Sequence, residues 1–259
     1  MLTVGQVYDH INGFAPFETC ESWDNSGLLM GSRKTPVKAA LCALDLSRAV
    51  FEEALEKGAN LIVTHHPILF GGRKNLCEDD VNGSLLCEMV RNHMALIAAH
   101  TNFDKAQGGV SDILAKWLDI GNVRPVEGDE EGYLRIGELG YPVELEKLVE
   151  RAERQLRTKV RAYGSLHQTI YKVAVCGGAG GEFARLAQAA GADAYVTGEM
   201  RYHDSFDLAQ EGFATLQCGH DATERIAVGQ LAGLVQDSAK ANGEDIAVFV
   251  SERAGFLIG

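Results

Sequence analysis

The sequence repeats part of itself, and this repeat restricts the fold more than any other feature. Residues 41–66 align with residues 174–199 without a gap. Within the repeat, residues 58–64 and 191–197 both run from a glycine into an apolar segment that contains β-branched or aromatic side chains, as expected for a strand that follows a turn. The two halves of the chain are therefore expected to share one local path.

A helix is predicted ahead of each of these strands. Residues 47–57 and 182–190 carry good helix formers and stop just before a glycine, the pattern of a helix C-terminus. Further apolar runs at 95–99 and 214–218 predict a third strand in each half. The expected fold class is α/β, with two pseudo-symmetric α/β domains, each β-α-β-α-β in outline.

The length of 259 residues allows two domains of ordinary size. We place the first α/β half at residues 1–124 and the second at residues 125–259. Residues 126–163 depart from the repeat and predict an added α+β element at the start of the second half. A C-terminal strand near 246–258 can pack with either half, and we name the first half as its candidate partner.

The charge balance argues against nucleic acid as a partner. Lysine and arginine total 24 against 36 aspartates and glutamates, which gives a net charge of -12. Such a field repels a phosphate backbone rather than releasing its counterions.

The cysteines and the hydropathy pattern indicate a soluble, cytoplasmic protein. The six cysteines show no C-x-x-C spacing and are expected to be reduced and mostly buried. No stretch approaches the roughly 20 apolar residues that span a bilayer. The first residues also lack the basic-then-apolar pattern of a secretion signal.

Three polar stretches follow predicted strands, and together they offer ligands for metal. Each is weak alone, because histidine and aspartate are ordinary residues at a helix start, but side chains beyond strand ends converge in open α/β folds. Imidazole and carboxylate suit zinc, manganese or iron, and more than four such groups indicate two ions that share a carboxylate. The candidates are His65, His66, His100, Asp104, His220 and Glu224.

Three further segments carry a functional and a structural interpretation. The glycines at 177–181 predict a tight β-to-α turn, with anion binding as the alternative. Glu199, Arg201 and His203 occupy the place that the paired histidines hold in the first half, so they are candidates for acid, base or anion clamp, or else a solvated loop. Around Trp23 we expect a structural turn with a buried tryptophan.

Five ordered motifs, spread over essentially the whole chain, resemble one known family. It is the GTP cyclohydrolase I type 2 homologue family, also called the Nif-three-like dinuclear metal centre hexameric proteins. The motifs are Trp23-Asp24-Asn25-x-Gly27-Leu28, Thr64-His65-His66-Pro67, His100-Thr101-x-x-Asp104, Thr197-Gly198-Glu199 and Gly219-His220-x-x-x-Glu224.

The resemblance implies a dinuclear metal site in the cleft between the two α/β domains, and a toroidal homohexamer. It implies two divalent ions per subunit, for which zinc, manganese, iron and nickel all stay open. His100, Glu199 and His203 would stand near the ions as catalytic candidates. The ligands carried over by motif are His65, His66, Asp104, His220 and Glu224.

The expected function is that of a dinuclear-metal hydrolase acting on a small molecule, with GTP as one candidate substrate. In a reaction of the GTP cyclohydrolase type, a metal-bound hydroxide opens the imidazole ring of the purine and releases formate. Two alternatives keep the metals: a phosphoesterase or amide hydrolase, and a non-enzymatic metal-handling or scaffold protein. Five ligands over two ions leave open positions, which favours chemistry over a closed structural site.

Overall fold

The computed structural model describes residues 1–71 and 75–253. By its internal contacts the chain divides into two compact units. Among the described residues, unit 1 comprises Met1–Phe103 together with residues 228–253, and unit 2 comprises Asp104–Ala227. Each is described by itself below.

The sheet of unit 1 is mostly parallel. Its order is β1-β4-β3-β2-β11, in which only the edge strand β1 runs antiparallel to its neighbour. The strands are β1 (Gly27–Met30), β2 (Ala39–Ala43), β3 (Leu61–Thr64), β4 (Ala95–Ala98) and β11 (Ala247–Val250).

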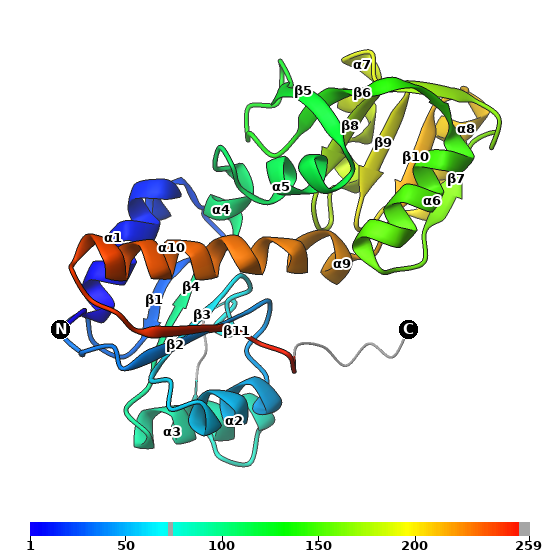
Figure 1. Cartoon of the computed structure of the whole chain (residues 1–259). Coiled ribbons are helices and arrows are strands. Elements are labelled where there is room, and N and C mark those ends of the chain that lie inside the picture. The colour runs from blue at the N-terminus through cyan, green and yellow to red at the C-terminus, as the bar shows by residue number, and fades with distance from the viewer. Residues whose placement is uncertain (72–74, 254–259) are drawn as a thin grey trace. The chain divides into compact units, whose positions relative to one another are not determined.

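Helices cover both faces of this sheet (Figure 1). Helices α1 and α10 pack against each other, and α10 also contacts β2, β3 and β11. Helices α2 and α3 share one apolar cluster with the opposite face, around Phe51, Ile62 and Met89. The helices are α1 (Val4–Phe14), α2 (Arg48–Glu56), α3 (Val81–Arg91) and α10 (Val228–Ala241), with the short α4 (Thr101–Lys105) at the unit boundary.

Unit 2 has a mixed sheet of order β5-β6-β8-β9-β10-β7, with β8, β9 and β10 parallel. Helices α5 and α6 pack on one face of it, around Leu114 and Leu148, while α7 and α8 pack on the other, around Tyr195. The strands are β5 (Ile120–Pro125), β6 (Arg135–Glu144), β7 (Arg161–Tyr163), β8 (Thr169–Cys176), β9 (Ala194–Thr197) and β10 (Ala214–Gln217). The helices are α5 (Val110–Trp117), α6 (Leu145–Leu156), α7 (Ala184–Ala189), α8 (Tyr202–Gln210) and α9 (His220–Glu224).

The predicted fold class is confirmed, because both units follow the same β-α-β-α-β path. It runs β2-α2-β3-α3-β4 in unit 1 and β8-α7-β9-α8-β10 in unit 2. The local signals act as expected at α2, where the Ser47 side chain accepts a hydrogen bond from the Val50 amide and Gly58 follows at a φ of 67°. The added α+β element at 126–163 is formed by β6, α6 and β7.

The C-terminal strand belongs to unit 1, where β11 pairs in parallel with β2. The predicted strand near 246–258 extends beyond residue 253 and in that part lies outside the described residues. A domain is a part of the chain that can fold by itself, and a static structure does not test this. The boundary between residues 124 and 125 therefore stays a prediction.

The cysteines are all free thiols. Burial raises the pKa of Cys42 and of Cys218 to about 12, which keeps both thiols protonated and inert. Cys176 is buried as well, whereas Cys77 is exposed and the other two are half-buried.

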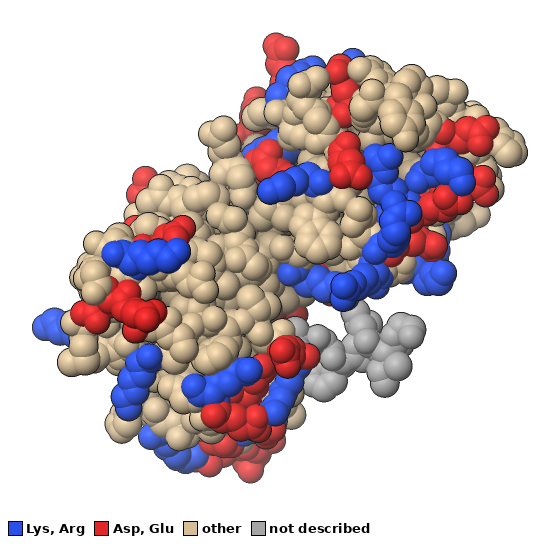
Figure 2. All heavy atoms as spheres, in the orientation of Figure 1, with Lys and Arg blue, Asp and Glu red and all other residues tan. Residues whose placement is uncertain are grey.

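Charges of both signs are mixed on the surface. Figure 2 shows basic side chains over α6 and β7 with acidic ones among them, and within α6 the Lys147 ammonium lies 2.9 Å from the Glu150 carboxylate. Among the described residues, no helix is long and apolar enough to cross a bilayer.

A buried carboxylate ties the segment after β11 to α2. Glu53 accepts hydrogen bonds from the Ser251 hydroxyl at 2.6 Å and from the Glu252 amide at 3.3 Å. Burial by itself raises the pKa of Glu53, but these bonds and the charge of Lys57 outweigh it and hold the pKa below its ordinary value of 4.5. The folded protein therefore binds this proton more weakly than the unfolded chain does.

We expect Glu53→Gln to lower the free energy of unfolding at pH 7 by about 1.5–3 kcal/mol, the worth of hydrogen bonds to a charged group. The wild-type contribution is present above pH 4.5 and is lost as the pH falls toward the lowered pKa, so the difference between the proteins should shrink there. Urea unfolding at several pH values measures this. Glu52→Gln, on the exposed side of the same helix, is the control; an equal difference at every pH would contradict the prediction.

Candidate metal centre

Two adjacent histidines leave the end of β3 in unit 1. Neighbours in a straight strand point to opposite faces, but here the chain bends, and the His65 and His66 rings lie 5.0 Å apart between centroids. The bend is held by backbone bonds to the chain after β2, from the His65 amide to Ala43 and from the His66 amide to Leu44. Both imidazoles therefore lie close together at the end of β3.

A third histidine joins them from the end of the neighbouring strand β4. The His100 ring lies 5.2 Å from that of His65 and 5.5 Å from that of His66. One nitrogen from each of the three rings falls within 4.8 Å of the others, close enough to share one ion. The family resemblance implies that His100 stands beside the metals as a catalytic candidate, and the geometry also makes it a candidate ligand.

The hydrogen bonds of the three rings fix which nitrogen can bind metal. Each Nδ1 lies 2.8 Å from an oxygen, namely the Ala99 carbonyl for His65, Asp45 for His66 and Asp24 for His100. A carbonyl or carboxylate oxygen can only accept, so each Nδ1 carries the proton and each Nε2 presents its lone pair. This pattern of outer oxygen partners is typical of metal-binding histidines.

Asp24 is the most strongly held of these partners. Its side chain is fully buried and accepts hydrogen bonds from His100, from the Thr101 hydroxyl at 2.6 Å and from the Ser26 hydroxyl at 2.9 Å. Burial alone raises the pKa of Asp24, but the hydrogen bonds from His100, Thr101 and the Asn25 amide hold it well below its usual range. Asp24 is therefore a carboxylate that orients His100.

We expect Asp24→Asn to weaken metal binding by about 10- to 100-fold, the usual cost of losing an outer partner of a ligand. The asparagine replaces one carboxylate oxygen by an N–H donor, so His100 loses the charged acceptor that fixes its tautomer. Competition with a chromophoric chelator measures the affinity for Zn²⁺. Asp9→Asn, which removes an exposed carboxylate of the same unit, should leave the affinity unchanged; equal affinity of the Asp24 variant would show that His100 needs no such partner.

Unit 2 contributes a second group, built around Glu224. Helix α9 starts directly after β10 and places His220 and Glu224 four residues apart, with His220 Nε2 3.1 Å from Glu224 Oε2. The Glu224 side chain is buried, and Asp104 offers an oxygen within 4.8 Å of it. An imidazole and two carboxylates thus lie within reach of a hard or borderline cation.

The glycine-rich turn after β8 makes room for this group. A Cβ on Gly178 would lie 2.2 Å from Glu224 Oε1, so the glycine leaves free the space that this carboxylate occupies. The Gly178 amide donates to the Thr223 hydroxyl and the Gly180 amide to the Thr197 hydroxyl. Because these two N–H groups are engaged inside unit 2, the turn interpretation of 177–181 is favoured over phosphate binding.

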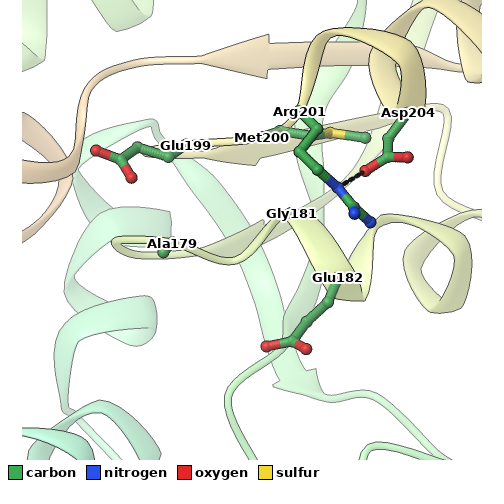
Figure 3. Close-up of a pocket in the computed structure, with 7 residues that line it drawn as sticks. All are labelled: Ala179, Gly181, Glu182, Glu199, Met200, Arg201 and Asp204. Atoms are coloured by element: carbon green, nitrogen blue, oxygen red, sulfur yellow. Dashed lines mark hydrogen bonds and ion pairs between the residues drawn. The ribbon is translucent and has the colours of Figure 1, made fainter.

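The loop after β9 holds the remaining catalytic candidates, and they do not gather at one point. Glu199 Oε1 lies 3.7 Å from His220 Nδ1, on the side opposite to Glu224. Figure 3 shows the Glu199 carboxylate directed away from Arg201, which pairs with Asp204 at 2.8 Å. His203 is exposed on α8, and its ring contacts Tyr202.

A hollow of about 450 Å³ lies beside this loop in unit 2. Its charged lining consists of the carboxylates of Glu182, Glu199 and Asp204 and of the single guanidinium of Arg201, which is already paired. Such a surface disfavours a phosphate chain.

The model of the Duf34/NIF3 family (NGG1p interacting factor 3) matches residues 2–254. The chain belongs to the Duf34/NIF3 family. The family resemblance found in the five motifs is thereby confirmed over nearly the full length.

Known NIF3 relatives match this chain from end to end. It is 33% identical to a GTP cyclohydrolase 1 type 2 homolog of Streptomyces coelicolor, over 97% of this chain and 92% of that one. It is 34% identical to NIF3-like protein 1 of Drosophila melanogaster, over 95% and 85%. Among solved structures, Staphylococcus aureus hypothetical protein SA1388 superposes with a TM-score of 0.90 at 26% identity, covering 98% of this chain and 99% of that one.

The NIF3 chain presents a donor set that fits divalent metal, since neutral imidazoles and buried carboxylates are the ligand types of zinc, manganese and iron. Two carboxylates that orient the imidazoles, Asp24 and Asp45, were not predicted from the sequence. The motif around Asp24 could have indicated this role, because a turn by itself gives no reason to bury a carboxylate.

The expectation of a buried tryptophan in that turn was wrong. The Trp23 side chain is 56% exposed. Asp24 takes the interior position through its bonds to His100 and Thr101, and the neighbouring side chain consequently points outward.

Proposed function

We propose that this NIF3 chain is a metal-dependent hydrolase whose divalent ions are held by the histidine group of unit 1 and by the carboxylate group of unit 2. The observation that carries the proposal is the group of three histidines in unit 1, each with its Nδ1 bonded to an oxygen. Histidines that merely fill a core have no need of three matched tautomers, whereas a metal site does.

The residues divide by ligand type. His65, His66 and His100 would hold one ion through Nε2, and Asp104, His220 and Glu224 would supply an imidazole and carboxylates for another. Bound ions of this kind supply Lewis-acid activation of water near neutral pH. Glu199, whose Oε1 lies 3.7 Å from His220 Nδ1 and so beyond hydrogen-bond distance, would act on that imidazole through its charge.

GTP is the proposed substrate, since relatives of this length carry the name GTP cyclohydrolase 1 type 2 homolog. The reaction adds one water to C8 of the purine and breaks the C8–N9 bond, leaving a formamide. A second water then cleaves the formamide and releases formate. Glu199 and His203 stay candidates for moving the protons between N9 and water.

A small amide is the second candidate substrate. Two observations favour it: the lining of the hollow in unit 2 is acidic, and the Gly178 and Gly180 amides of the glycine turn already donate to threonine hydroxyls. Neither place offers a binding site for a triphosphate. Amide cleavage needs the same activated water and no phosphate contacts.

The test is an assay of metal-loaded protein with GTP, a chromogenic phosphoester and a small amide, with chelator-treated protein as control. We expect formate release from GTP only in the loaded protein, at about two ions per chain, as a two-metal site requires. Turnover of the phosphoester or the amide alone would move the protein to the second class. Two tightly bound ions with no turnover of any substrate would favour metal handling. The proposed homohexamer is tested separately by light scattering.

A further inference from the structure

An exposed aromatic pair stands beside the three histidines of unit 1. Trp23 and Phe70 are each 56% exposed, and their ring centroids lie 5.7 Å apart at an interplanar angle of 62°. Large apolar side chains that are exposed next to one another often mark a binding site. Such a pair is therefore a candidate for ligand contact.

The turn that carries the tryptophan is held firmly. The Asp24 amide donates to the Glu21 carbonyl at 2.9 Å, and the Glu21 amide donates to the Thr101 hydroxyl at 3.0 Å. The Asn25 side chain donates to the Leu69 carbonyl at 2.6 Å, which joins this turn to the segment that bears Phe70. A preorganised aromatic surface binds more tightly because little entropy is lost on contact.

The aromatic surface continues directly into the histidines. The Trp23 and Phe70 ring centroids lie 6.2 Å and 6.3 Å from that of His100, with edge-on angles of 77° and 73°. His100 in turn contacts His65 and His66. A flat ligand resting on the indole would thus have its edge next to the imidazoles that are proposed to hold metal.

We propose that Trp23, supported by Phe70, is the stacking surface for the flat heteroaromatic ring of the substrate, a nucleobase in the case of a nucleotide. This inference rests on the proposed function and adds the group that recognises the ring. Stacking on an aromatic face accepts any base. With a net charge of -12 the protein does not attract a phosphate chain from a distance, so contact with the ring is the available source of affinity.

The experiment uses the fact that the chain has two tryptophans. Trp117→Phe leaves Trp23 as the single tryptophan, whose emission can be excited selectively over that of the tyrosines, and changes a partly exposed residue of unit 2. We expect guanosine to quench this fluorescence saturably in metal-free protein, and inorganic tripolyphosphate to leave it unchanged. By calorimetry, Trp23→Ala should weaken guanosine binding by roughly 5- to 150-fold, Trp23→Phe should retain most of the affinity, and Trp117→Phe should match wild type.

Equal guanosine affinity in wild type and Trp23→Ala would overturn the inference. So would a Trp23 that acrylamide cannot quench, combined with a change of oligomeric state in Trp23→Ala, because the pair would then be a contact between copies of this chain. Failure of the proposed function is distinguishable. If guanosine binds through Trp23 but GTP is not hydrolysed, the stacking surface is supported and the hydrolase function is contradicted. If Trp23→Ala releases formate as fast as wild type, the hydrolase function is supported and the stacking surface is contradicted.

Discussion

Replacing His66 by alanine or Glu224 by glutamine is expected to abolish metal-dependent turnover, lowering it by roughly 10⁴-fold, as loss of one member of a catalytic unit does. His66 offers its Nε2 from unit 1, and Glu224 is the buried carboxylate around which the group in unit 2 is built. Each change removes one proposed ligand and leaves the rest of its own unit intact. Steady-state rates with metal-loaded protein measure the effect.

The double variant decides whether the two ligand groups act in the same catalytic step. If they do, the double variant His66→Ala/Glu224→Gln should turn over no more slowly than the worse single variant, because one substitution alone already blocks that step. If each unit holds an ion of its own that acts independently, the losses should multiply. His10→Ala in unit 1 and Glu150→Gln, an exposed carboxylate of α6, are matched controls that should keep wild-type rates.

Those parts of the fold that depend on local signals could be predicted from the sequence. Strand runs bounded by glycine, and a helix capped by Ser47 and closed before Gly58, require only neighbours along the chain. The repeat added the expectation that both halves follow one path, and β2 to β4 and β8 to β10 confirm it.

The ligand candidates could also be predicted, because residue type and position after a strand are both visible in the sequence. The partners of those residues could not. His100 and Asp24 are separated by 76 positions, and no local pattern says which carboxylate a buried turn will bring to an imidazole. The exposure of Trp23 follows from that same distant contact, which is why the turn alone predicted the wrong side for it.

Gly178→Ala is expected to weaken metal binding by about 10- to 100-fold while leaving unit 2 folded. The new methyl group would displace the carboxylate of Glu224, a proposed ligand, and a displaced ligand should cost about as much affinity as the loss of a residue that orients one. The new methyl group would lie 2.2 Å from Glu224 Oε1 and 3.4 Å from His220 Nε2. That oxygen is the far end of a flexible side chain, so the carboxylate can swing aside at small cost. The backbone bonds of residue 178 to Thr223 and Glu199 are kept. The substitution therefore acts on ligand position more than on stability.

Gly191→Ala separates this displacement from backbone strain. Gly178 and Gly191 both have positive φ, 60° and 80°, where alanine costs roughly 1–2 kcal/mol, but a Cβ at Gly191 meets no atom within 4 Å. Both variants should lose similar stability in thermal unfolding, and only Gly178→Ala should lose Zn²⁺ affinity in chelator competition. If the two variants bind Zn²⁺ alike, Glu224 is not a ligand at the position seen here, and metal binding in unit 2 must depend on other carboxylates.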